Sequence, residues 1–359
     1  MRRELDSELG FTQEEIDECL GREGLLSLEL EFTKACNLRC IYCYSSAGNA
    51  LEEELSIDEL ISVIEQAQQL GARRIVLLGG GEPFLSPYVR EVIRYIHPLG
   101  LSKAVFTNGT LLTKELCGFL FDHRVKVAIK YNSFLPAVQD ALAGVAGAHA
   151  GIQRGLQLLM ASGYPDADHP LCIQSIICRS NRAEILDMWV WAREHGITPY
   201  FEVLTDQGRA RQHLDLTLSP EEHQQVFQAL SDNDRRRFGI SWSGRPPIAG
   251  FTCRRHLYSC LVDTQGFVQP CVGVDLSVGN IREQPLGAIL RESRAIRELR
   301  RIHQHIDPSC RACQFAGECY GCRGNAYQAT GDYLGTDPAC WLRPRMDADA
   351  CRRDGDAKG

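Results

Sequence analysis

The sequence predicts an α/β fold, a partial (β/α)6 barrel of the TIM type followed by a small C-terminal domain. Between residues 26 and 204, six apolar or alternating segments that suit β-strands are each followed by a helical or loop pattern. This alternation favours parallel strands with crossovers on the outside, and six strands are too few for a closed eight-stranded barrel. The 359-residue chain is long enough for the barrel and a cysteine-rich appendage.

The elements are justified in chain order. Thr12 and Glu15 have the spacing of a capping box and predict a short acidic helix, and Ser56 and Glu59 predict another helix in the same way. The six predicted strands are residues 26–32, 74–78, 103–107, 126–130, 171–178 and 199–204. The predicted helices are residues 56–70, 87–97, 113–121, 151–162, 182–195, 218–232 and 288–303. Residues 259–263 and 267–270 predict a hairpin that turns at Gly266.

Three cysteines, Cys36, Cys40 and Cys43, follow the first predicted strand with the spacing C-x3-C-x2-C. Three thiolates on one loop can hold three corners of a four-iron cluster and leave the fourth iron open to a small molecule. Zinc and unrelated buried thiols are the alternatives. Zinc usually takes four ligands, often in C-x2-C pairs, and no fourth cysteine or histidine occurs in the next fifty residues.

A glycine turn with one carboxylate ends the second predicted strand, in the run Leu-Leu-Gly-Gly-Gly-Glu-Pro-Phe. Gly80 and Gly81 let the backbone approach a ligand closely, and Glu82, before Pro83, can pair with an ammonium group. The carboxyl ends of parallel barrel strands form one face, so we expect this turn beside the cysteine loop.

The chain contains 16 cysteines, and a second set lies near its end. Its pattern is C-x12-G-x4-C, then C-x2-C-x5-C-x2-C, then a single cysteine. The tight C-x2-C-x5-C-x2-C group alone also suits a zinc site, and a disulfide framework would need an oxidising compartment. No secretory signal precedes the first domain and no long apolar run is present, so we expect a cytoplasmic protein without a membrane span.

The cysteine loop, with Tyr42 before its third cysteine, and the Gly-Gly-Glu-Pro turn together resemble the radical S-adenosylmethionine (SAM) superfamily. The resemblance implies that SAM chelates the open iron and is cleaved to methionine and a 5′-deoxyadenosyl radical, which abstracts a hydrogen atom from the substrate. It also implies that Glu82 contacts the amino group of SAM.

The C-terminal cysteines resemble the SPASM domain, in which eight cysteines bind two auxiliary four-iron clusters. Carried over, the first cluster would take Cys253, Cys260, Cys271 and Cys322, and the second would take Cys310, Cys313, Cys319 and Cys340. The family commonly has three residues between the last two cysteines of the tight group. Here only two intervene, which puts Cys322 in question as a ligand.

The resemblance divides the chain into an N-terminal helical extension (1–24), a radical SAM barrel (25–232), a SPASM domain (233–345) and a disordered tail (346–359). Three further residues are candidates for contact with SAM. Asn108 ends the third strand, Lys130 stands where many relatives carry serine, and Arg209 lies in a Gly-Arg-Ala loop after the sixth strand. A plain Asn-Gly turn and a solvated lysine are the alternatives for the first two.

The leading functional hypothesis is a maturase that oxidises or cross-links a side chain of a peptide or small protein. The alternative is a radical dehydrogenase or tailoring enzyme for a small molecule, and a non-enzymatic iron–sulfur carrier would need no SAM site. Oxidation needs a base, and Asp275, Glu202 and Tyr258 are candidates. The resemblance implies a flavodoxin- or ferredoxin-like electron donor and allows a separate leader-binding protein. The formal charge of −7 argues against a nucleic-acid partner.

Overall fold

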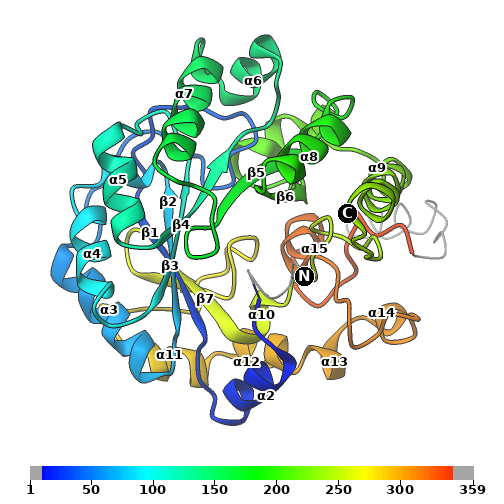
Figure 1. Ribbon diagram of the computed structural model, residues 1–359. Helices are drawn as coiled ribbons and strands as arrows, with labels where there is room; N and C mark the ends of the chain where they lie inside the picture. The colour runs from blue at the N-terminus through cyan, green and yellow to red at the C-terminus, as the bar shows by residue number, and fades with distance from the viewer. Residues whose placement is uncertain (1–9, 343–359) are drawn as a thin grey trace, which may run out of the picture.

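The computed structural model describes residues 10–342 and contains one nine-stranded sheet in the order β6-β5-β4-β3-β2-β1-β7-β8-β9 (Figure 1). The first six strands are parallel to their neighbours, as repeated strand–helix alternation requires. Their bounds are Ser27–Thr33 (β1), Arg74–Gly80 (β2), Ser102–Thr107 (β3), Val125–Lys130 (β4), Leu171–Ile177 (β5) and Thr198–Val203 (β6). The predicted partial (β/α)6 barrel is confirmed.

Helices form the outer layer around these strands (Figure 1). They are α3 (Ile57–Gln69), α4 (Val89–Ile96), α5 (Lys114–Asp122), α6 (Pro136–Ala143), α7 (Ala148–Ala161) and α8 (Ile185–Glu194), with α9 (Pro220–Asn233) beyond α8. The predicted capping box at Ser56 is present. Helix α6 was not predicted, because it is short, begins with a proline and has no side-chain cap.

Strand β1 separates the apolar core from the polar interior of the barrel. Leu28, Leu30 and Phe32 pack into the main hydrophobic core, while Glu29 and Glu31 are buried on the opposite face. Successive side chains of a strand point to opposite faces, so the interior carries carboxylates. These carboxylates lie beneath the candidate site described below.

The C-terminal region extends the same sheet. Strand β7 (Ser259–Val262) pairs in parallel with β1, and β8 (Phe267–Gln269) and β9 (Gly279–Asn280) follow in antiparallel order. The predicted hairpin is confirmed, and Gly266 turns it with φ = +87°, a conformation that favours glycine. The pairing of β7 with β1 fixes the C-terminal cysteines relative to the barrel.

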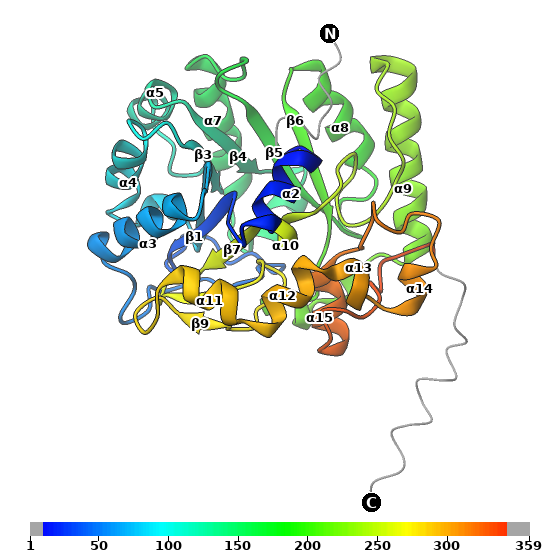
Figure 2. The same cartoon turned by 90° about the horizontal axis from the view of Figure 1, so that it is seen from below.

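Short helices of the C-terminal region line one edge of the molecule (Figure 2). They are α11 (Leu286–Glu292), α12 (Arg294–Arg300), α13 (Ile302–His305), α14 (Pro308–Arg311) and α15 (Arg323–Thr330). The short helix α10 (Arg255–Tyr258) precedes β7 and lies nearer the middle of this view. The single helix predicted at residues 288–303 is wrong. It is interrupted at Ser293, whose side chain accepts a hydrogen bond from the Ile296 amide and starts a new helix.

The N-terminal helix α2 (Gln13–Gly21), capped by Thr12 and Glu15 as predicted, packs against this edge. Ile16 and Cys19 share a small hydrophobic cluster with residues of α10 and α12. Among residues 10–342, no helix has the length and apolarity needed to cross a membrane. The predicted tail at 346–359 lies outside the described residues.

Candidate active site

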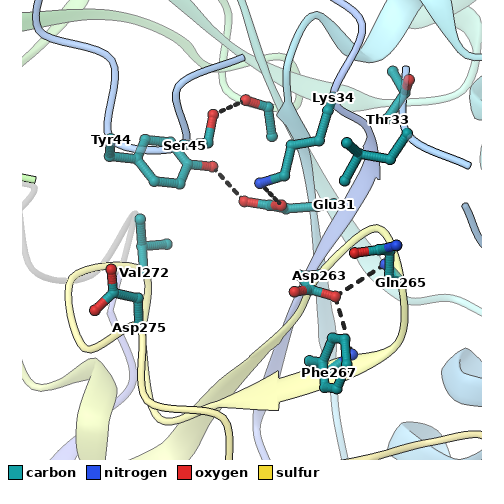
Figure 3. Close-up of polar contacts among 12 residues, drawn as sticks. Glu31, Thr33, Lys34, Tyr44, Ser45, Asp263, Gln265, Phe267, Val272 and Asp275 are labelled. Atoms are coloured by element: carbon teal, nitrogen blue, oxygen red, sulfur yellow. Dashed lines mark hydrogen bonds and ion pairs between the residues drawn. The ribbon is translucent and has the colours of Figure 1, made fainter. Parts of the chain in front are cut away.

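The cysteine loop begins where β1 ends, and the Glu31 carboxylate of β1 is hydrogen-bonded to residues at both ends of the loop (Figure 3). The buried Glu31 carboxylate accepts hydrogen bonds from Lys34 Nζ at 2.9 Å and from the Tyr44 hydroxyl at 2.8 Å. Lys34 precedes the first cysteine and Tyr44 follows the third, so one carboxylate joins both ends of the loop. Cys36, Cys40 and Cys43 then line a common cavity.

Burial raises the pKa of the Cys40 thiol to about 11 and also raises the pKa of Cys36. Iron takes thiolate, so metal binding at this loop must displace the thiol protons. The neighbouring thiols interact electrostatically, since the charges of Cys43 and Cys36 each contribute to the raised pKa of Cys40. The structure therefore brings the three predicted ligands together.

Arg209, predicted as a SAM contact, forms hydrogen bonds to the backbone of this loop. Its Nε donates to the Cys40 carbonyl at 2.8 Å and its Nη1 donates to the Ala47 carbonyl at 2.7 Å. Its backbone amide donates to the Cys43 carbonyl at 3.0 Å. The side chain does not line the cavity.

Replacing Arg209 with alanine is expected to speed the loss of iron to a chelator, because two charge-assisted hydrogen bonds, each worth about 1.5–3 kcal/mol, no longer hold the loop. The measurement is the rate of iron release from anaerobically prepared protein. Arg236→Ala is the matched control, because its exposed side chain contacts only the Asp232 carbonyl nearby. Equal release rates for Arg209→Ala and wild type would contradict the bracing role.

The glycine turn lies directly against the cysteine loop. The Gly81 amide donates to the Thr33 carbonyl at 2.7 Å, and the Glu82 amide donates to the Ala35 carbonyl at 2.8 Å. A Cβ on Gly81 would lie 2.0 Å from the Ala35 oxygen, so only glycine allows this approach. The turn and the loop are therefore one backbone-bonded unit at the ends of β1 and β2.

Glu82 is buried with its carboxylate held at the cavity wall. The carboxylate accepts from the Thr107 hydroxyl at 2.7 Å and from the Asn108 amide at 2.8 Å. Burial outweighs these hydrogen bonds and raises the pKa of Glu82 to about 7. The Thr107 hydroxyl and the Asn108 amide that bond this carboxylate carry no charge.

Asn108 connects the third strand to the cysteine loop. Its side-chain amide donates to Asn37 Oδ1 at 2.9 Å, and its own oxygen accepts from the Thr110 amide. Both Asn108 and Tyr42 line the cavity, whereas Pro83 does not. Pro83 instead begins the short helical turn Pro83–Leu85 behind Glu82.

The cavity itself has a volume of about 300 Å³ and spans both cysteine sets. The cysteine loop after β1 and the glycine turn contribute one group of lining residues, and Cys253, Cys271 and Cys322 contribute another. The cavity is partly open to solvent and is lined by cysteines of both predicted sets.

Polar side chains from β4, β5 and β6 also line the cavity. Lys130 Nζ lies 3.8 Å from a Glu202 carboxylate oxygen and 5.2 Å from the centre of the Tyr42 ring. Gln174 donates to the same Glu202 carboxylate at 2.6 Å. Lys130, Gln174 and Glu202 sit on neighbouring strands, and this array can hold a polar substrate group.

Backbone contact between two glycines brings Cys271 and Cys322 together. A Cβ on Gly273 would lie 2.7 Å from the Gly324 Cα, so the loop after Cys271 touches the start of α15. Asp337 accepts from the Cys322 amide at 2.6 Å and fixes that turn. The shortened spacing before Cys322 therefore leaves it at the cavity.

The lining residues around Cys253, Cys271 and Cys322 fit an anionic, metal-containing group. Arg323 is buried with Nε and Nη2 unpaired inside the protein, and His256 Nε2 is also buried without a partner. Within residues 10–342, no three cysteine, histidine or acidic side chains converge on a point that could hold a single metal ion. The sulfur atoms are instead spread around the wall of the cavity.

The remaining cysteines of the tight group lie outside the cavity. Cys319 is half-buried near Cys313 and Asp337, whose charges contribute to its raised pKa after burial itself. Its sulfur accepts from the Gly321 amide at 3.4 Å. Cys310 and Cys340 likewise do not line the cavity, so the second predicted ligand set is separate from the substrate space.

Besides the second cysteine set, five predicted site residues do not line the cavity. Cys260 is fully buried in the main hydrophobic core, and Tyr258 packs edge-on against Phe11 in the cluster around α2. Asp275 lies in the loop after Cys271, close to Val272 (Figure 3), and it accepts hydrogen bonds from Gln207 and Gln328. The other two are Pro83 and Arg209, described above. Of the three candidate bases, Glu202 lines the cavity.

Sequence reasoning missed Arg255, His256, Gln174 and Arg323, which all line the cavity. Arg255 contacts the Tyr200 hydroxyl and lies 3.5 Å from Glu29. Arg255 and Gln174 occur in basic or apolar stretches without a motif. His256 carried a weak signal, because it stands three positions after Cys253 and imidazole is a common metal ligand.

Comparison with known proteins agrees with both halves of the chain. Residues 30–188 match the radical SAM superfamily, and residues 253–314 match the SPASM iron-sulfur cluster-binding domain. The chain is 28% identical over 344 residues to an AdoMet-dependent heme synthase of Methanosarcina barkeri, covering 88% of this chain and 95% of that protein. It is 28% identical to the PqqA peptide cyclase of Gluconobacter oxydans, covering 90% and 92%.

A solved structure, that of Streptococcus suis SuiB bound to precursor peptide SuiA, superposes with a TM-score of 0.69 at 14% identity. It covers 92% of this chain and 80% of that one and shows the shared fold. The two matched domains imply SAM and iron–sulfur clusters as cofactors. The chain belongs to the radical SAM superfamily and carries a SPASM iron–sulfur cluster-binding domain after its barrel.

Proposed function

We propose that this enzyme is a radical SAM maturase that oxidises or cross-links a side chain of a peptide or small protein. The observation that carries the proposal is a cavity of about 300 Å³ that is lined both by Cys36, Cys40 and Cys43 and by Cys253, Cys271 and Cys322. A substrate radical formed there would lie between two iron–sulfur sites. One site serves hydrogen abstraction and the other can accept an electron.

The chain's own residues have distinct roles in this proposal. Cys36, Cys40 and Cys43 hold the cluster that supplies the electron for SAM cleavage when it is bound. The buried Glu82 carboxylate pairs with the amino group of SAM. Glu202 is the candidate base, since its carboxylate lies in the cavity beside Lys130.

We further propose two auxiliary clusters. Cys253, Cys271 and Cys322 would hold the one at the cavity, and Cys310, Cys313, Cys319 and Cys340, which do not line the cavity, would hold the other. When bound, these clusters would supply an acceptor for the substrate's electron and a route for it towards the surface. A flavodoxin- or ferredoxin-like protein is the proposed electron donor. A separate leader-binding protein remains part of the peptide hypothesis.

A small-molecule substrate is the second candidate function. The similarity to a heme synthase over 95% of that protein favours it. Lys130, Arg255 and Arg323 add cationic side chains to the wall of the cavity. The PqqA peptide cyclase, matched over 92% of its length, favours the peptide. Carboxylates occur on both kinds of substrate, so the cationic wall fits either one.

The test is formation of 5′-deoxyadenosine with two probes, a pooled library of synthetic peptides and an iron porphyrin that bears carboxylate side chains. The reconstituted full chain is supplied with SAM and dithionite, and products are analysed by mass spectrometry. A peptide that loses two hydrogens in step with 5′-deoxyadenosine supports the maturase. Turnover of the porphyrin alone overturns the peptide substrate, and no SAM cleavage under any condition overturns radical chemistry.

A further inference from the structure

The auxiliary site at the cavity has only three cysteines in position. Cys253, Cys271 and Cys322 line the cavity. Burial raises the pKa of Cys271 and of Cys322, and the nearby charge of Cys253 raises both further. Cys260, the fourth cysteine expected from the family pattern, does not line it. A four-iron cluster held by protein alone takes four ligands, so one position is unfilled by cysteine.

The register of the sheet explains why Cys260 is absent. Cys260 on β7 pairs with Leu28 on β1, and paired residues of parallel strands point to the same face. That face is the hydrophobic core, where Leu28 and Cys260 are both fully buried. The opposite face holds Glu29, which lies 3.5 Å from the cavity-lining Arg255. Cys260 therefore lies on the far side of the sheet from the cavity.

His256 is the candidate for the fourth ligand. It is 95% buried, since its exposed fraction is 5%, and it lines the same cavity as the three cysteines. Its Nε2 has no hydrogen-bond partner in the protein, which is costly for a buried nitrogen unless a ligand completes it. The ring packs edge-on against Tyr320 at 5.5 Å, beside the Cys319–Cys322 turn.

Cys253 and His256 are also close along the chain. Cys253 lies just before the N-cap Arg254 of α10 (Arg255–Tyr258), and His256 is the second residue of that turn. Two residues therefore separate a lining thiol from a lining imidazole. Imidazole nitrogen replaces thiolate in some iron–sulfur centres.

We propose that His256 Nε2, rather than the Cys260 thiolate, is the fourth protein ligand of the auxiliary cluster held by Cys253, Cys271 and Cys322. Replacing a thiolate with a neutral imidazole removes one negative charge from the cluster and raises its reduction potential. The unpaired Nε and Nη2 of the adjacent Arg323 act in the same direction. A higher potential suits a cluster that accepts an electron from a substrate radical.

The test uses the full chain carrying Cys36/Cys40/Cys43→Ala, in which only auxiliary clusters remain. The protein is produced with ¹⁵N-labelled histidine, reduced without oxygen, and studied by electron–nuclear double resonance together with iron analysis. We expect a ¹⁵N coupling from a directly bound nitrogen. This coupling is measured with His256 in place, so the first result does not depend on a substitution at that residue. In His256→Cys the iron should remain while the coupling disappears.

Cys260→Ala is the matched comparison, because it removes the rival ligand. We expect it to keep both the nitrogen coupling and the auxiliary iron, about eight atoms per chain for two clusters. Loss of about four irons in Cys260→Ala, or a reduced cluster without any nitrogen coupling, overturns His256 as ligand.

The inference rests on the auxiliary cluster of the proposed function, and the two fail differently. Absence of auxiliary iron overturns the electron relay, and with it any ligand at this site. Auxiliary iron without nitrogen coupling overturns only the role of His256.

Discussion

Replacing Cys36, Cys40 and Cys43 together with alanine is expected to lower the iron content from about twelve to about eight atoms per chain and to abolish SAM cleavage. The three thiols line the cavity. They are the only cysteines in the loop from Lys34 to Tyr44, whose two ends are hydrogen-bonded to the Glu31 carboxylate. Without them no iron is held beside Glu82. The expected loss of 5′-deoxyadenosine is complete, because the binding residues that remain carry no electron source.

Iron and labile sulfide analysis of anaerobically purified protein, with chromatography of 5′-deoxyadenosine, checks this result. Cys117→Ala is the control, since Cys117 is fully buried in the hydrophobic core away from the cavity. Its iron content should match wild type. A triple variant that keeps all its iron would contradict the assignment. About four irons in the native chain and none in the triple variant would support the SAM cluster and contradict both auxiliary clusters.

Glu82→Gln is expected to weaken SAM binding by about tenfold to a hundredfold, the loss of one charge-assisted contact worth about 1.5–3 kcal/mol. Glutamine has nearly the same shape. Its Oε1 can accept from the Asn108 amide, and its Nε2 can donate to the Thr107 hydroxyl, which bonds the other carboxylate oxygen in the native site. The main change is the loss of the negative charge that pairs with the SAM ammonium. Calorimetric titration of cluster-loaded protein with SAM measures the change in dissociation constant.

The stability of the same variant separates binding from folding. Burial raises the pKa of Glu82 to about 7, above its unfolded value, so ionised Glu82 destabilises the ligand-free fold as pH rises through that value. Removing the charge should therefore leave the melting temperature at pH 8 unchanged or higher. A lower melting temperature together with weaker SAM binding would assign Glu82 a structural role instead.

Local spacing predicted the parts of the site that one loop or one turn contains. Cys36, Cys40 and Cys43 lie within eight residues, so their convergence depends on little beyond the strand that precedes them. The Gly80–Gly81–Glu82 turn was predictable because a glycine-rich turn has few backbone alternatives. Arg209 shows the limit. Its Gly-Arg-Ala loop was recognised, yet its guanidinium bonds the backbone of the cysteine loop rather than facing the cavity.

The sequence by itself determined the parallel barrel, the SAM-type cysteine loop and the presence of a second cysteine set, because periodicity and short-range spacing act within one element. Only the tertiary structure decided which distant cysteines meet. The register of β7 on β1 turns Cys260 into the core, and contact between Gly273 and Gly324 brings Cys271 to Cys322. It also left His256 buried with an unpaired nitrogen at the cavity. Strand register and backbone packing join segments far apart in the chain, and a pattern read along the chain does not record them.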